Sequence, residues 1–145
     1  MMTSADIEMH MLRRMSEAGA NTGKGIAYAG DAKTYFELLD KYLTNKHFDL
    51  LEADIRKGDR RLALQRTRAL MDAAERIGVI RVFHAFSELV EAIKATESAM
   101  FLLRICGKIK ETCQFLLYIL DEPKRVEENQ KENIFGIQDF CFVEK

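Results

Sequence analysis

Apolar side chains recur every three or four positions along most of the chain, which is the spacing that gives a helix one buried face. In the second half, this pattern predicts a helix over 60–77, one from about residue 79 to residue 93, and a long one over 97–120. Gly78 is placed to end the first of these helices and Pro123 to end the last, because neither residue type favours continuing a helix.

The first half shows the same periodicity in shorter pieces. A lead-in helix is predicted from residue 3 or 4 up to Gly19. Glycines and other turn-forming residues concentrate over 21–31, so we expect a turn segment there. Asp31 is placed to cap the next helix, which continues up to Gly58 with a kink or break at 44–45.

Helices with one apolar face each and short connections between them predict an all-α fold. An antiparallel four-helix bundle is the simplest arrangement that buries all of these faces together. We therefore predict one bundle domain over 1–122, which starts with the lead-in helix. A charged linker and an apolar tail are predicted over 123–145.

The apolar tail, from Ile134 to Val143, needs a surface on which to pack. The helix over 97–120 carries apolar residues outside its main stripe, and these offer the tail a second surface. The sequence leaves open whether this packing occurs within one chain or between two copies. The residues in question are Phe101, Phe115, Tyr118 and Ile119.

Composition narrows the class of protein. Apolar residues make up 48% of the chain and charged residues 31%, which indicates a folded domain rather than a disordered one. The net charge is -1, so no overall field attracts nucleic acid or an anionic membrane. Because the apolar runs are too short to span a membrane and the first residues lack a signal-peptide pattern, we expect a cytoplasmic protein. Cys106, Cys113 and Cys141 lack metal-ligand spacing, and we expect no metal, cofactor or disulfide.

Two stretches carry specific motifs. The segment over 18–43 contains Gly-hydrophobic-x-Tyr, then Gly-Asp, then x-x-x-Tyr-x-x-Leu-Leu, and the segment over 68–78 reads RALMDAAERIG. Together they resemble the histidine-containing phosphotransfer (HPt) domain, a bundle that relays phosphoryl groups in bacterial two-component signalling. The central motif of that family is His-x-Leu-Lys-Gly/Ser-x-Ala-x-x-Ile-Gly. The resemblance covers about residues 10–120 and implies a bundle of the HPt type.

The residues that perform the chemistry of that motif are replaced here. Arg68 stands where the family has its phosphoacceptor histidine, and a guanidinium offers no lone pair that could attack phosphorus. Met71 replaces the helper lysine, which removes a charge that would neutralise phosphoryl oxygens, and Asp72 adds a carboxylate where the family has a small residue. The resemblance therefore implies a pseudo-phosphotransfer domain without enzyme activity.

The function that remains by resemblance is to dock the receiver domain of a response regulator, or the histidine kinase, as an adaptor in a phosphorelay. Six basic residues and one acidic residue lie between residues 56 and 68, which favours an acidic receiver pocket as partner, although an ordinary solvated helix face would look the same. No nucleic-acid motif accompanies them. The expected binding residues are Arg61, Arg68, Met71, Asp72 and Glu75.

Two other functions stay open at this point. The first is a structural module that forms a homodimer through Phe101, Phe115 and the tail, without receiver binding. The second is a working phosphotransferase whose acceptor has moved to His84, where Glu88 follows one helical turn later. His10 and His47 have no flanking pattern, and we predict that all three histidines lie at the surface.

Overall fold

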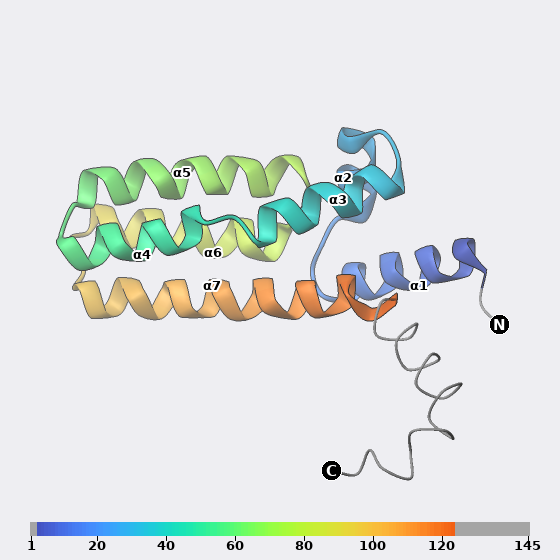
Figure 1. Ribbon diagram of the computed structural model, residues 1–145. Helices are drawn as coiled ribbons and strands as arrows, with labels where there is room; N and C mark the ends of the chain where they lie inside the picture. Colours follow the sequence, from blue (N-terminus) through green and yellow to red (C-terminus); the bar gives the residue numbers. More distant parts are fainter. Residues whose placement is uncertain (1–2, 124–145) are drawn as a thin grey trace, which may run out of the picture.

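The computed structural model describes residues 3–123 of the chain, and all of the regular structure in that range is helical. Figure 1 shows long helices packed side by side, with shorter ones gathered at one end. The predicted all-α fold is confirmed. The elements are α1 (Ser4–Glu17), α2 (Thr22–Ala29), α3 (Ala32–Leu43), α4 (His47–Lys57), α5 (Arg60–Arg76), α6 (Ile80–Lys94) and α7 (Ala99–Leu120).

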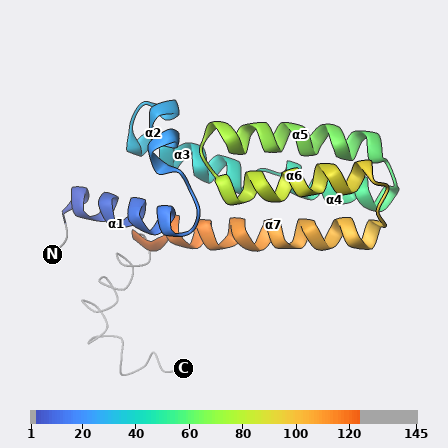
Figure 2. The same ribbon diagram turned by 180° about the vertical axis from the view of Figure 1, so that it is seen from behind.

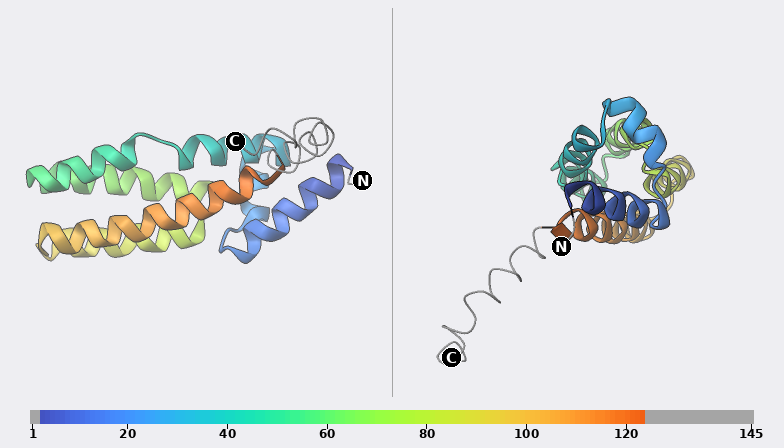
Figure 3. Two further views of the ribbon diagram at one scale, coloured as in Figure 1. Left: turned by 60° about the horizontal axis from the view of Figure 1, so that its bottom comes forward. Right: turned by 90° about the vertical axis from the view of Figure 1, so that its right-hand side faces the viewer.

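Helices α4, α5, α6 and α7 form the bundle. Each packs against two neighbours, in the order α4, α5, α6, α7 and back to α4, so α5 and α7 lie at opposite corners (Figure 3). Neighbouring helices run in opposite directions, as the two views in Figures 1 and 2 show. α3 extends the column of α4 and also packs on α7, while α1 lies against the end of α7.

The helix ends follow local signals in the sequence. The Asp59 carboxylate accepts a hydrogen bond from the backbone N–H of Leu62 at 3.1 Å, and Asp31 caps α3 in the same way. Gly58 ends α4 with a left-handed backbone at φ 80°, where a residue with a Cβ would be strained. The predicted break at residues 44–45 separates α3 from α4. The predicted helix stops and caps at these positions are confirmed.

The core consists mainly of the apolar stripes predicted for α1 and for α3 to α7. Thr67 is also buried, and its hydroxyl donates to the backbone carbonyl of Ala63 at 2.7 Å, so it adds no unsatisfied group. Because the inner face of every bundle helix is fixed by this packing, the outer faces are held on rigid supports. The largest fully buried side chains include Tyr35, Phe86, Leu51, Leu102, Ile109 and Leu116.

The glycine-rich region over 21–31 differs from its prediction. It forms the two-turn helix α2, because the Asn21 side chain accepts a hydrogen bond from the backbone N–H of Lys24 at 3.0 Å and caps it. Gly25 is buried in the middle of this helix, and a Cβ there would lie 2.1 Å from a ring carbon of Tyr35. The glycine therefore serves close packing against α3 rather than a turn.

The segments over 18–43 and 68–78, which carry the two motifs, lie in contact with each other. The backbone N–H of Asn21 donates to the carbonyl of Gly78 at 2.7 Å, and that of Arg81 donates to Gly19 at 3.3 Å. A Cβ on Gly78 would lie 2.4 Å from the Asn21 carbonyl oxygen. The glycines of the motifs thus hold two loops together at one end of the bundle, which also fixes the end of α5.

The outer surface of α7 differs in part from its prediction. Phe101, Phe115 and Tyr118 are exposed as expected, but Ile119 is fully buried and belongs to the core. The tail and most of the linker, residues 124–145, lie outside the described residues, and so do the predictions made for them. Within the described part of the chain, no helix is both long enough and apolar enough to cross a membrane.

Candidate functional site

The outer face of α5 brings together the residues that the sequence assigns to partner binding. Arg61, Arg68, Asp72 and Glu75 are all exposed, and Met71 is half-buried against the core. At 1.5 Å per residue, the face from Arg61 to Glu75 is about 21 Å long. The opposite face of α5 packs in the bundle, so these side chains project from a fixed backbone. We call this surface the α5 face.

The basic residues between 56 and 68 do not act as one surface. The guanidinium of Arg60 donates to the backbone carbonyl of Glu97 at 2.5 Å, and that of Arg66 pairs with Asp54. Both are therefore used inside the protein. Arg68, by contrast, is exposed and makes no ion pair or side-chain hydrogen bond within residues 3–123. The cations left for a partner on this stretch are Arg56, Lys57, Arg61 and Arg68.

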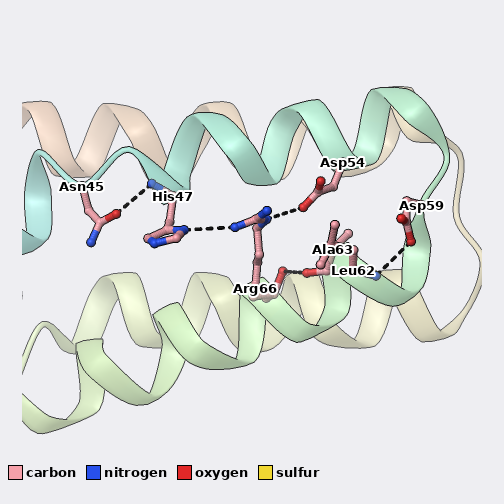
Figure 4. Close-up of polar contacts among 8 residues, drawn as sticks. Asn45, His47, Asp54, Asp59, Leu62, Ala63 and Arg66 are labelled. Atoms are coloured by element: carbon pink, nitrogen blue, oxygen red, sulfur yellow. Dashed lines mark hydrogen bonds and ion pairs between the residues drawn. The ribbon is translucent and has the colours of Figure 1, made fainter.

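A polar network connects α4 to α5 (Figure 4). Asp54 is buried, and its carboxylate lies 2.5 Å from Nε of Arg66. Nη1 of Arg66 lies 3.0 Å from Nδ1 of His47, and the Asn45 side chain accepts from the backbone N–H of His47 at 2.7 Å. Because a guanidinium only donates, Nδ1 of His47 accepts, and the proton of the neutral ring is on Nε2. The network fixes α4 against α5.

A groove of about 390 Å³ runs beside the α5 face, between α5 and the junction of α3 with α4. Its floor includes Tyr42, whose hydroxyl donates to the backbone carbonyl of Leu70 at 2.7 Å and so has no capacity to donate elsewhere. Ala69 and Ala73 of α5 border the groove, and their small side chains leave it open. The groove is mostly apolar, with Arg66 and His47 at its polar end.

The three histidines lie at or near the surface, as predicted. His84 is exposed on α6, where its ring makes an edge contact with Phe83. His10 is half-exposed, and its Nε2 lies 3.1 Å from the carboxylate of Glu122, which Arg14 also contacts at 2.7 Å. His84 therefore presents its ring to solvent, whereas His10 and His47 each have a polar partner.

The two described cysteines are buried and not bonded to each other. Burial raises the pKa of both thiols, Cys106 and Cys113, to about 12. Both therefore remain protonated at neutral pH, and neither can serve as a nucleophile there. Within residues 3–123, no three His, Cys, Asp or Glu side chains converge to form a metal site.

The network of Asp54, Arg66 and His47 and the adjoining groove were not found from the sequence. Arg66 is twelve residues from Asp54 and nineteen from His47, so no local spacing rule relates the three. The sequence held one weak signal. Ile55 belongs to the apolar stripe of its helix, and Asp54 comes directly before it. A carboxylate at the edge of a buried stripe needs a cationic partner.

No family model matches this chain, and no curated protein or solved structure matches it either.

Proposed function

We propose that this protein is a noncatalytic adaptor of a two-component phosphorelay, a degenerate relative of the HPt domain that docks a receiver domain or a histidine kinase through the α5 face. One observation carries the proposal: Arg68 stands exposed and unpaired among the described residues, at the position where the HPt motif has its phosphoacceptor. Met71 and Asp72 lie within about one helical turn of it on the same helix.

The chemistry of these side chains supports binding without phosphoryl transfer. A guanidinium stays protonated at any physiological pH, so Arg68 cannot attack a phosphoryl group. It can, however, donate several hydrogen bonds to carboxylates, and the pocket of a receiver domain carries an acidic cluster. Arg61 adds a second cation toward the start of α5. Asp72 opposes Arg68 in charge, which favours a partner with both acidic and basic groups.

The groove beside the α5 face supports the same function. A charged contact alone gives weak and salt-sensitive binding, because exposed ion pairs contribute about 1 kcal/mol or less. The mostly apolar groove next to Ala69 and Ala73 can receive an apolar side chain of the partner. Protein–protein interfaces commonly combine an apolar centre with a polar surround. Because receivers and kinases of this kind meet inside the cell, the proposal includes a cytoplasmic location.

A binding experiment tests this proposal. Isolated receiver domains of phosphorelay response regulators are titrated into the full-length protein by isothermal calorimetry, and we expect at least one to bind. The Arg68→Glu variant should weaken that binding by about tenfold or more, because it replaces an attraction by a repulsion. The control variant Lys24→Glu makes the same charge change on exposed α2 and should bind like the wild type. Equal loss in both variants, or no binding to any receiver domain or histidine kinase in the same titration, contradicts the proposal.

The relocated acceptor remains the competing hypothesis, and the geometry favours His84 over His47 for it. His84 is exposed, whereas Nδ1 of His47 accepts from Arg66 and its other nitrogen carries the ring proton. A histidine in that state has no free lone pair to offer. Phosphoryl label recovered on His84 after incubation with a phosphorylated receiver would replace the noncatalytic proposal by this one.

A further inference from the structure

The outer face of α7 carries a regular series of exposed side chains. They are spaced alternately by three and four residues, which is the repeat of a helix that pairs with another helix along a seam. All of them are exposed, and Phe101 and Phe115 are 40% and 48% exposed. We call this series the α7 seam; its residues are Phe101, Arg104, Lys108, Glu111, Phe115 and Tyr118.

We propose that the α7 seam binds the α7 seam of a second copy of this chain, with the two helices antiparallel about a twofold axis between Lys108 and Glu111. In this register, Lys108 of each copy faces Glu111 of the other. One layer outward, Arg104 faces the ring of Phe115, a favourable cation–π pairing. At the two ends, Phe101 faces Tyr118. The proposal depends on the four central positions.

The order of charges along the seam identifies a second copy as the occupant. In an antiparallel pair, each cation meets an opposite charge or an aromatic ring, and each contact is repeated by symmetry, as a twofold interface requires. A parallel pair in register would instead place Lys108 against Lys108 and Glu111 against Glu111. The seam is therefore complementary to itself in one orientation and repulsive to itself in the other.

Gly107 provides a second and independent observation. It lies in the middle of α7, next to Lys108, where a glycine makes a helix less stable than an alanine would. A Cβ there would meet nothing within 4 Å, so packing within the described chain does not require the glycine. A neighbouring helix at the centre of the seam does explain it, because a glycine lets two backbones approach closely.

This inference does not depend on receiver docking. α7 and α5 lie at opposite corners of the bundle, so a dimer joined along α7 leaves both α5 faces open (Figure 3). If both proposals hold, the dimer presents two docking faces that point away from each other.

Sedimentation equilibrium of the full-length protein tests the dimer. The wild type should change with rising concentration from the 16.7 kDa monomer to twice that mass. Lys108→Glu and Glu111→Lys should each weaken dimerisation by about tenfold or more, because each places like charges opposite one another in two symmetric contacts. An equimolar mixture of the two variants should dimerise again, since each then offers the charge that the other lacks. Lys24→Glu serves as the charge-matched control, and circular dichroism verifies the fold of every variant.

Each of the following results would overturn the proposal. A wild type that stays monomeric at all concentrations excludes any stable seam. If both charge variants still dimerise, the interface lies elsewhere. If the equimolar mixture of the two variants does not dimerise, the interface also lies elsewhere. The double variant Phe135→Ser, Phe142→Ser distinguishes the tail as occupant: if it abolishes the dimer while Lys108→Glu does not, the tail rather than the α7 seam joins the copies.

Discussion

The α5 face and the α7 seam lie on two helices of the same bundle, yet they differ in kind. Both helices bury one face in the common core and expose the other. The α5 face has four charged residues and one half-buried methionine, whereas large apolar side chains stand exposed at both ends of the seam. The charges of the α5 face favour brief contacts that charge can steer, and the aromatic rings at the ends of the seam add apolar area to its charged centre. One rigid fold thus presents two exposed helix faces of different character.

The largest expected effect separates two helical glycines, Gly25 on α2 and Gly107 on α7. Gly25→Ala should destabilise the protein by about 3 kcal/mol, because its Cβ would lie 2.1 Å from the ring of Tyr35, which is fully buried and cannot move away. Gly107→Ala should instead stabilise the monomer by about 0.5–1 kcal/mol, because its Cβ meets open space. Urea unfolding at low protein concentration measures both. A loss of stability in Gly107→Ala would show that the glycine is needed within the chain itself.

The next largest effect is a difference in stability loss between substitutions of two arginines on α5. Arg66→Ala should lower the free energy of unfolding by about 3 kcal/mol, because it leaves the buried carboxylate of Asp54 without its partner. Arg68→Ala should change it by less than about 0.5 kcal/mol, since Arg68 is exposed and unpaired within the described chain. Urea unfolding followed by circular dichroism provides both values.

A double variant tests why Arg66→Ala should lower the free energy of unfolding. Asp54→Ala with Arg66→Ala should lose less stability than Arg66→Ala alone, because no uncompensated charge then stays buried. Equal costs for Arg66→Ala and Arg68→Ala would remove the distinction between an internal arginine and one that is free for a partner.

The smallest expected effect at neutral pH is the influence of two buried thiols on the inner face of α7 on protein stability. Burial raises the pKa of Cys106 and Cys113 to about 12, above the usual value of 9.0 that applies when the chain is unfolded. Above about pH 9, the unfolded chain therefore loses these protons while the folded protein keeps them, so stability falls as the pH rises toward 12 and is unaffected below 9. Tyr35, whose pKa burial also raises to about 12 from 10.0, adds to this loss at higher pH.

Urea midpoints measured from pH 7 to pH 11 test this pH dependence. The double variant Cys106→Ala, Cys113→Ala should show a shallower decline above pH 9 than the wild type. A wild-type midpoint that stays constant across that range would contradict the burial of these thiols on α7.

Much of the fold could be predicted, because one apolar stripe per helix is a local property of the sequence. The helices from α3 to α7 follow it, with their caps at Asp31 and Asp59. α2 was missed because its glycines argue for a turn; what makes it a helix is the Asn21 cap and the close contact of Gly25 with Tyr35. Ile119 was misplaced because the stripe pattern of α7 alone does not reveal that α1 and α3 also pack on this helix.

The candidate site was predictable to a smaller degree. The exposure of Arg68 follows from its place outside the apolar stripe of α5, since Thr67 and Leu70 face inward. The pairing of Arg66 with Asp54 does not follow, because it depends on how α4 and α5 pack side by side. For that reason the sequence counted Arg66 among the cations available to a partner, whereas the structure uses it inside the protein.

The central claim, that this protein binds a receiver without accepting phosphate, has one most direct test. The wild type is incubated with a phosphorylated receiver domain that it binds, and its intact mass is measured at neutral pH, where phosphohistidine survives. We expect no mass gain for the wild type. The variant Arg68→His, Met71→Lys, Asp72→Gly, which restores the motif, should gain one phosphoryl group. A phosphoryl group stably attached to the wild type would contradict the account.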